Sequence, residues 1–432
     1  MHIKKHLSFS ALRNMLSERF NEIADNRQAG KVRFDLHDCL MSGFAMMLFQ
    51  DPSLCDFQRR LEEVYQKSNL HSIFGVSDIP KDSQMRELLD EVAPGDIEPV
   101  FATILKQIQR GKHLESYRLL GNRYLVPIDG SEYFSSRHIH CPGCLTQNKG
   151  GVRYHHNIVQ AVIAHPDMKQ VLPLAPEEVT NRDGTEKQDC EINAAKRLLA
   201  KLRKAHPKLP FIIGGDGLFS KQPFIDICKQ QAMSFILVAK PADHKVLFEY
   251  VEEIAAMGQA GTLELVDLKK RRHCYRWVNQ VPINGSEKAD DVNFFDYRIV
   301  SGDKVTYRNS WVTDLWVDAD NIVELVKAGR CRWKIENETF NTLKNQGYHI
   351  EHNFGHGQKH LSMVFFLLNL LAFYVHQVLE MTDLYYQRLR YKKFTSRREF
   401  WNQLRCTFRI LLFRNWEHMF GYLLDPPPLQ PP

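Results

Sequence analysis

The sequence predicts a mixed α/β fold with a helical N-terminal region and a β-rich insertion. Residues 1–120 contain amphipathic stretches, such as 97–108, whose apolar residues recur at the three- and four-residue spacing of a helix. After residue 120 the pattern changes to short apolar runs that are typical of strands. Helical patterns lie between these runs, which indicates one mixed sheet with flanking helices rather than a helical bundle.

The strand and helix signals follow in a clear order along the chain. Strands are expected at 123–127, 157–164, 171–174, 211–213 and 234–239, and helices at about 186–205 and 222–231. Charged and aromatic residues alternate from 241 to 317, which predicts antiparallel strands with a turn at Gly302 and Asp303. Helix resumes at residue 320 and continues to about 345, with a break expected near Gly329; a last helical region covers 361–381.

These patterns divide the 432 residues into five segments. They are a helical N-terminal region at 1–120, a segment of strands and helices at 121–240, a β-rich insertion at 241–318, a helix with an acidic residue and closing helices at 319–382, and a basic segment with a Pro-rich tail at 383–432. The apolar stretch 363–375 is shorter than the roughly 20 residues of a membrane span and contains Asn369, so we interpret it as a buried helix.

Composition limits the class of protein. The net charge of +6 is a mild basic excess, which permits a polyanionic partner without requiring one. Nine cysteines, an odd number spread over the chain, do not fit a secreted disulfide framework and favour a reducing compartment. The N-terminus lacks the apolar run and cleavage site of a secretory signal. We therefore expect a cytoplasmic protein.

Three acidic residues stand out by their context. Asp129 and Asp216 each follow an apolar run and precede a glycine, at the point where a buried strand is expected to end. Either aspartate alone is more often a turn residue. Together with Glu336 on a predicted helix, they could share two divalent cations ~3.5–4 Å apart that activate a water and stabilise a leaving phosphodiester oxygen. Carboxylate oxygens favour Mg²⁺ or Mn²⁺ over zinc.

Helix geometry favours Glu336 over its neighbour Glu338. At 3.6 residues per turn, Glu336 shares one helix face with the apolar residues Phe340 and Leu343. Such a face is expected to point into the protein, whereas Glu338 points nearly opposite. We therefore choose Glu336 as the site carboxylate.

These residues resemble a known family. The segments VPIDGSEYFSS, IIGGDGLFS and RCRWKIENETFNTLKNQGY are similar to the three signature regions of bacterial insertion-sequence transposases of the DDE type, in the cut-and-paste group with an Arg-x-x-x-Glu third motif. The resemblance covers about residues 120–380. It implies an RNase H-like mixed sheet and a β-rich insertion within the 120 residues between Asp216 and Glu336.

The resemblance also implies the activity and the site. Asp129, Asp216 and Glu336 would be the catalytic triad that binds two Mg²⁺ or Mn²⁺ ions, and Arg332 takes the place of the arginine of the motif. The expected function is cleavage at transposon terminal inverted repeats and strand transfer into double-stranded target DNA, by a homodimer on DNA in the bacterial cytoplasm, associated with the nucleoid. Residues 121–240 would then be the first part of the catalytic domain, and the helical region 1–120 would bind the transposon ends. Two positions depart from the motif: Gly329 replaces its tyrosine, and Leu343 replaces its lysine. Lys344 lies one residue later and could still reach a DNA phosphate, because its side chain is flexible.

Other functions remain open at this stage. Arg332 could form an ordinary helix ion pair with Glu336 instead of contacting DNA. An RNase H-like nuclease without strand transfer could use the same triad. A domesticated DNA-binding protein would lack catalysis, and that alternative predicts a broken triad.

A second cluster suggests a different metal. Cys141 and Cys144 form a C-x-x-C pair, with His138 and His140 just before it, and these four residues could hold a structural zinc. Because a second cysteine pair is absent, we favour a reduced loop without metal. His155 and His156 follow nearby. The His-rich segment 348–360 directly follows the predicted Glu336 helix and could line the site, but it lacks an HExxH pattern and we assign no metal there.

Two basic segments are candidates for DNA contact. Lys269, Lys270, Arg271 and Arg272 precede Trp277, which suits backbone contact plus base stacking; an edge strand guarded by charges is the plainer interpretation. A second group in the C-terminal segment is suited to phosphate contacts or is a solvated helix face: Arg388, Arg390, Lys392, Lys393, Arg397 and Arg398.

Overall fold

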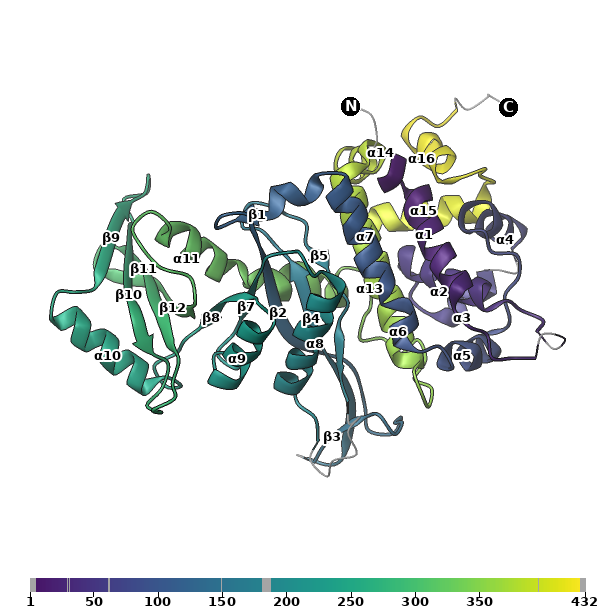
Figure 1. The fold of residues 1–432 in the computed structure, drawn as a ribbon. Helices are drawn as coiled ribbons and strands as arrows, with labels where there is room; N and C mark the ends of the chain where they lie inside the picture. Colours follow the sequence, from purple (N-terminus) through teal and green to yellow (C-terminus); the bar gives the residue numbers. More distant parts are fainter. Residues whose placement is uncertain are drawn as a thin grey trace.

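Helices form the N-terminal region, as the sequence predicts (Figure 1). The structure, a computed structural model, describes residues 5–28, 30, 32–60, 63–148, 150–180, 188–394 and 396–427. The helices of this region are η1 (Lys5–Leu7), α1 (Phe9–Glu22), α2 (Leu36–Leu48), α3 (Leu54–Arg60), α4 (Val64–Asn69), η3 (Leu70–Phe74), α5 (Asp82–Asp90), α6 (Pro94–Ile97), α7 (Pro99–Arg110) and η4 (His113–Tyr117).

Within the described residues, 12 strands form one mixed sheet. Its main path runs β3-β4-β2-β7-β8-β12-β11-β10-β9, with β1 paired to β2, and β5 and β6 paired to β4. The parallel pairs are β2 with β7 and β7 with β8; the other pairs are antiparallel. The strands are β1 (Arg118–Leu119), β2 (Arg123–Ser136), β3 (Leu145–Gln147), β4 (Arg153–Ile163), β5 (Leu172–Pro173), β6 (Glu177–Val179), β7 (Phe211–Gly215), β8 (Ser234–Val238), β9 (Gly261–Val266), β10 (Arg272–Pro282), β11 (Asp291–Ser301) and β12 (Lys304–Thr313). The predicted mixed α/β class is confirmed.

Two helices connect the parallel strands. Helix α8 (Glu191–Ala205) precedes β7 and packs on β4 and β6, while α9 (Gln222–Gln230) precedes β8. Both have an apolar face at helical spacing, which in α8 includes the buried Leu198 and Leu202. These helices therefore cover the sheet beside the strands that bear the two aspartates.

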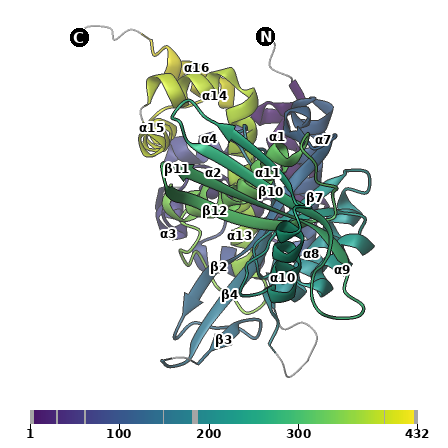
Figure 2. The ribbon, with the colours of Figure 1, turned by 90° about the vertical axis from the view of Figure 1, so that its left-hand side faces the viewer.

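The insertion contains a helix that the sequence pattern missed. Helix α10 (Lys245–Ala256) precedes β9 and packs on β10, burying Leu247 and Val251. The expectation of strands alone from residue 241 is therefore wrong at this point. The turn at Gly302 and Asp303 is confirmed, because β11 ends and β12 begins on either side of it. Figure 2 views the molecule from this side, with β10–β12 in front of the rest of the sheet.

The helix break predicted near Gly329 lies two residues beyond it, at Cys331. Helix α11 (Ile322–Cys331) continues through Gly329, which is buried because Trp311 of β12 packs against it. A Cβ at this position would lie 2.7 Å from the Trp311 ring, so the close approach requires glycine. The helical geometry is irregular beyond this point, because the π-helical segment η5 (Ile335–Phe340) leads into α12 (Asn341–Asn345).

Helix α13 (Leu361–Thr382) belongs to a helical body that the N-terminal and C-terminal helices form, and it lies on the side of this body next to the sheet, where it packs on α2 and α5 (Figure 1). It is long and apolar enough to cross a membrane, but 94% of its most apolar window is buried inside the protein. The interpretation of 363–375 as a buried core helix agrees with this burial. The polar Asn369 inside it donates to the carbonyl oxygen of Tyr348 at 2.7 Å.

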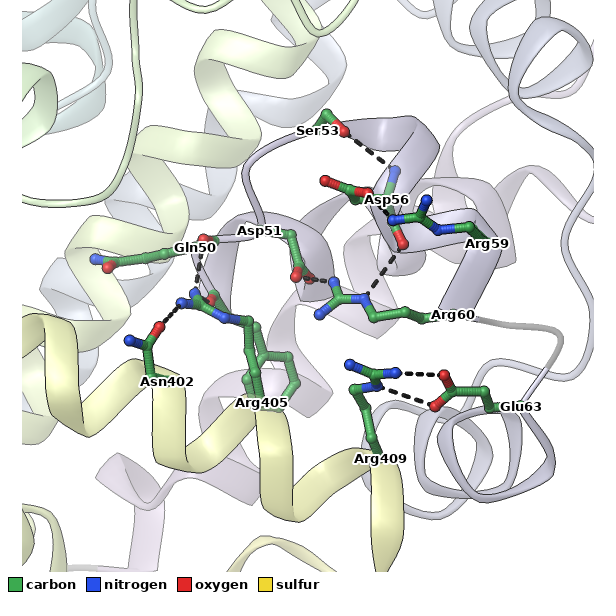
Figure 3. A network of polar contacts seen from close by, with 11 residues as sticks. Gln50, Asp51, Ser53, Asp56, Arg59, Arg60, Glu63, Asn402, Arg405 and Arg409 are labelled. Carbon is green, nitrogen blue, oxygen red and sulfur yellow. Dashed lines mark hydrogen bonds and ion pairs between the residues drawn. The ribbon is translucent and has the colours of Figure 1, made fainter.

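The C-terminal segment folds back onto the N-terminal helices. It contains α14 (Leu384–Arg388), η6 (Leu389–Lys393), α15 (Arg397–Ile410) and α16 (Trp416–Leu424). Figure 3 shows the polar contacts of α15: Arg405 donates to the carbonyl oxygen of Gln50 at 2.8 Å, and the Arg409 Nε donates to Glu63 at 3.0 Å. The expected segment 383–432 is therefore a folded part of the helical body up to residue 427, and residues 428–432 of its tail lie outside the described residues.

Candidate functional site

The two aspartates meet at one edge of the parallel strands. Strands β2 and β7 pair in parallel up to Pro127 opposite Gly214, and the same register continued by two residues sets Asp129 beside Asp216. Neighbouring strands lie ~4.8 Å apart, so the two backbones are adjacent here. Asp216 directly follows β7, as expected. Asp129 does not end its strand, because β2 continues to Ser136 in pairing with β4.

Glu336 reaches the same edge from the other side. It lies on η5, which packs against β2. The guanidinium of Arg332 lies 2.7 Å from the Glu336 carboxylate and 3.8 Å from the Asp129 carboxylate. The structure therefore brings Asp129, Arg332 and Glu336 together, and the helix ion pair considered for Arg332 is present.

The helix-face argument for Glu336 is wrong in one respect. The Glu336 side chain is 47% exposed, whereas Glu338 is half-buried. The cause is η5, since a π-helix closes its hydrogen bonds over five residues and rotates the side chains away from the 3.6-residue spacing assumed for them. The choice between the two glutamates stays a prediction, now supported by the contacts of Arg332 instead of by burial.

The charges at this edge influence one another. Burial raises the pKa of Asp129 to about 6, with further upward contributions from Glu336 and Asp216, while Arg332 opposes them. The Asp129 carboxyl group is therefore partly buried and lies near other acids. A bound cation would stabilise the ionised form of these acids, because each negative charge otherwise disfavours ionisation of its neighbour.

A fourth acid lies in the same place, and the sequence analysis missed it. Glu191 is the first residue of α8, and its carboxylate lies against the backbone of Gly130, where a Cβ would overlap it. Burial raises the pKa of Glu191, and the charge of Asp216 raises it further. An acid at a helix start is ordinarily explained by the helix dipole, so no local signal distinguished Glu191; only the packing of α8 beside β2 does.

The basic turn of the insertion lies away from these acids. Lys269 and Lys270 are exposed in the turn between β9 and β10, whereas Arg271 pairs with Asp267 at 2.7 Å and Arg272 lies 3.7 Å from Glu264. Strand β9 is the last in the sheet order, with five strands between it and β2. At ~4.8 Å per strand this is roughly 29 Å along the sheet. The structure thus does not bring the turn to the carboxylates.

Two other candidates for DNA contact have protein partners. The Trp277 ring lies over Gly261 of the neighbouring strand β9, so close that a Cβ on this glycine would overlap it. Trp277 is therefore half-buried in the insertion rather than fully presented for base stacking. Lys344 pairs with Glu351 at 2.8 Å, just beyond the end of α12.

The C-terminal basic residues divide into two groups. Arg388, Lys392 and Arg398 are exposed, which agrees with a solvated face. Arg397 instead pairs with the buried Glu380 at 3.1 Å, and Lys393 donates to the Leu424 carbonyl oxygen at 3.3 Å. These two residues hold helices together. The guanidinium of Arg390 lies over the ring of Tyr391 at 5.2 Å.

The C-x-x-C pair belongs to a buried cluster with other histidines than expected. Cys141 and Cys144 lie beside His156 of β4 and His356 of the segment between α12 and α13. His138 and His140, the expected partners, are exposed, and His140 stacks on Tyr154. The tetrad expected from the sequence is therefore wrong in its histidines. The sequence analysis noted His156 and the His-rich segment that contains His356. Their position beside the cysteines is a tertiary contact, which local sequence patterns do not predict.

The comparisons with known proteins add no family assignment. No protein-family model matches the sequence, and no curated protein matches it significantly. The arrangement of Asp129, Asp216 and Glu336 is therefore the main evidence for a function.

Proposed function

We propose that the protein is a DNA transposase of the DDE type, which cleaves DNA at transposon ends and transfers the freed 3′ end into target DNA. The observation on which this proposal rests is the meeting of Asp129, Asp216 and Glu336 at one edge of the sheet. The three residues come from β2, from the end of β7 and from η5. Their order along the chain and their supporting elements match the resemblance seen in the sequence.

The architecture around the acids supports an RNase H-like catalytic domain. The strands that place the two aspartates are parallel neighbours, and β4 continues the sheet antiparallel to β2. Strands β9–β12 and helix α10 lie between Asp216 and Glu336 in sequence and extend the same sheet. This is the order of strand, strand, β-rich insertion and helix that the resemblance implies.

The acids fit a site for hard divalent cations. Asp129, Asp216 and Glu336 would hold Mg²⁺ or Mn²⁺, since carboxylate oxygens are the ligands these ions prefer. Burial is the main cause that raises the pKa of Asp129, and the charges of Glu336 and Asp216 raise it further; a cation would offset this penalty on the ionised carboxylate. When bound, such ions neutralise the charge that develops on the phosphoryl group and its leaving oxygen.

The protein's own residues position the reaction. Phosphoryl transfer depends chiefly on orientation and on charge neutralisation, and it needs no covalent protein intermediate. Strands β2 and β7 fix the two aspartates against each other through their shared register. Arg332 contacts both Asp129 and Glu336, so it holds the helical acid toward the strand acid.

The proposal includes a partner and an assembly. The substrate is double-stranded DNA, at the terminal inverted repeats and at the target. Joining two ends requires two active sites, so a homodimer on DNA is part of the proposal. The N-terminal helical region is assigned to recognition of the transposon end, because the catalytic core should not itself be selective for sequence.

The test is cleavage of DNA that carries the inverted repeats flanking the gene. Purified protein should nick or cut at the repeat boundary with Mg²⁺ or Mn²⁺ and should be inactive in EDTA. Addition of a supercoiled target plasmid should give joined products. Cleavage without joining would favour the nuclease alternative, and end binding without any cleavage would favour the non-catalytic DNA-binding alternative.

Two variants assign the cleavage to the proposed site. Asp129→Asn and Asp216→Asn should each abolish cleavage and preserve binding to the end DNA, because each removes a metal-binding charge. Near-normal cutting by either variant would remove that residue from the triad.

A further inference from the structure

Four metal-ligating side chains converge at a place separate from the carboxylate edge. They are Cys141 and Cys144 of the β2–β3 connection, His156 of β4, and His356 of the segment that leads from α12 to α13. One ligand atom from each lies within 4.8 Å of all the others. All four residues are between 4% and 8% exposed.

The distances between these atoms match a tetrahedral zinc centre. The two sulfurs are 3.8 Å apart, the Nε2 of His156 is 3.4 Å from each sulfur, and the Nε2 of His356 is 3.5 Å from the Cys144 sulfur. Zinc bonds of ~2.3 Å to sulfur and ~2.0–2.1 Å to nitrogen, at tetrahedral angles, place two sulfurs about 3.8 Å apart and sulfur about 3.6 Å from nitrogen. The four side chains are thus already spaced as ligands of one ion.

A second layer of residues orients one ligand. The Nδ1 of His156 lies 3.4 Å from a carboxylate oxygen of Glu178, and the Tyr133 hydroxyl donates to the same oxygen at 3.1 Å. A carboxylate on the far nitrogen of an imidazole fixes the ring so that its other nitrogen faces the metal. The ring of Phe134 covers His356 at 4.2 Å. This arrangement resembles a supported metal site more than a chance grouping of polar residues.

We propose that Cys141, Cys144, His156 and His356 bind one structural Zn²⁺. Thiolate and imidazole ligands suit zinc and do not suit Mg²⁺. Four protein ligands fill the tetrahedral shell, so the ion has no open position for a substrate and serves structure rather than catalysis. Binding converts the two thiols to thiolates and releases two protons, which leaves the centre with no net charge.

The proposed zinc joins segments that are far apart in sequence. Cys141, Cys144 and His156 belong to the β2, β3 and β4 extension, and His356 follows Glu336 by 20 residues. The ion would therefore fasten the connection after the Glu336 helix to the strands next to Asp129. Under the proposed function this link would steady the distance between two catalytic acids, although the zinc site itself does not depend on that function.

Metal analysis of the full chain tests the site directly. Protein purified without chelator should contain about one zinc per chain by mass spectrometry of the metal. After removal of zinc under reducing conditions, added Co²⁺ should give thiolate-to-cobalt charge-transfer absorption and the intense d–d bands of tetrahedral coordination. Protein without zinc that also shows no such spectrum with Co²⁺ would overturn the proposal, as would protein that is purified under reducing conditions without zinc and with Cys141 and Cys144 already joined in a disulfide.

Matched histidine variants identify the ligands. His356→Ala should lower the zinc content at least several-fold and lower the melting temperature, whereas His140→Ala, in the same loop as the cysteines but exposed, should keep both. Loss of zinc in His140→Ala with zinc kept in His356→Ala would show that the tetrad is wrong. If His356→Ala fails to fold, the Co²⁺ spectrum of the wild-type chain and of His140→Ala still decides the question.

The readout separates this proposal from the proposed function. Zinc content and the Co²⁺ spectrum are measured without DNA. A chain that holds zinc but never cleaves DNA would overturn the transposase proposal alone. A chain that cleaves DNA with Mg²⁺ but has no zinc centre would overturn only the zinc proposal.

Discussion

The guanidinium of Arg332 lies 2.7 Å from the carboxylate of Glu336, one turn along the same helical segment. The same guanidinium is 3.8 Å from Asp129, so one cation faces two of the proposed metal ligands. In the absence of a metal, Arg332 is the charge that opposes the repulsion among these acids. Arg332 therefore orients these carboxylates and also competes with a metal ion for them.

The first prediction concerns this competition. Arg332→Gln should bind Mn²⁺ about three- to tenfold more tightly, because removal of a nearby positive charge favours a divalent cation; tenfold corresponds to about 1.4 kcal/mol. Calorimetry or Mn²⁺ paramagnetic resonance without DNA would measure the effect. Arg330→Gln is the matched control: it removes the same charge two residues earlier, in α11, where Arg330 lies over the ring of Tyr307. Unchanged Mn²⁺ affinity in Arg332→Gln would contradict this role.

The second prediction separates the two glutamates of η5. Glu336→Gln should abolish cleavage while end binding survives, because Glu336 is the helical acid held toward Asp129 through Arg332. Glu338→Gln makes the same chemical change two residues away and should cut normally. A dead Glu338→Gln beside an active Glu336→Gln would transfer the catalytic role to Glu338.

The third prediction concerns the fourth acid. Glu191→Gln should lower Mn²⁺ affinity and cleavage at least tenfold if its carboxylate completes the metal site beside Asp216. Its pKa is raised on folding, so at neutral pH the charged group opposes folding, and Glu191→Gln should unfold at the same or a higher temperature than wild type. Loss of activity would then be distinct from loss of structure.

The control for this prediction lies on the adjoining strand. Glu132 of β2 pairs with Arg153, and Glu132→Gln should leave cleavage unchanged. Wild-type cleavage by Glu191→Gln would exclude Glu191 from the metal site.

The fourth prediction concerns DNA affinity. Replacement of the exposed residues Arg388, Lys392 and Arg398 by glutamine should make the slope of log affinity against log salt shallower by up to about 2.7, since each phosphate contact to duplex DNA contributes ~0.9. Preference for the cognate end should change little, because phosphate contacts position the protein without reading sequence. An unchanged slope would mean that these residues do not contact DNA.

Arg397→Gln provides the contrast. It leaves Glu380, whose side chain is 3% exposed, without its ion-pair partner, which typically costs about 3–5 kcal/mol. We expect a lower melting temperature for this variant. A change in salt slope with unchanged stability would show that Arg397 contacts DNA after all.

The fifth prediction concerns acid stability. Burial, together with the charges of Lys106 and Arg203, lowers the pKa of His206, at the end of α8, to about 4. Because the unfolded pKa is about 6.5, the neutral form is favoured by folding, and stability is lost as the pH falls from 6.5 toward 4. His206→Gln should reduce the loss of unfolding free energy between pH 7 and pH 4.5 by about 2 kcal/mol.

Urea unfolding at the two pH values measures this difference. His138→Gln, a substitution of an exposed histidine, should show the pH dependence of wild type. Equal pH dependence in His206→Gln and wild type would mean that His206 is protonated in the folded protein without penalty.

The sequence by itself determined the features that depend on neighbouring residues. Apolar runs and helical spacing predicted the strands around Asp129 and Asp216, the helical N-terminal region and the buried α13, because these patterns are local consequences of burial. The C-x-x-C pair was equally visible. The sequence pattern did not predict the half-buried α10 in the insertion, because the alternation of charged and aromatic residues there indicated strands.

Only the tertiary structure decided which distant side chains meet. His356 joins Cys144 across 212 positions, and Glu191 reaches Gly130 only because α8 packs beside β2. Arg397 belongs to a run of basic residues in sequence, yet its contact with Glu380 makes it a structural residue. Local patterns cannot specify such partners, because the contacts depend on how separate elements pack and on irregularities such as η5, which redirect side chains without a sequence signal.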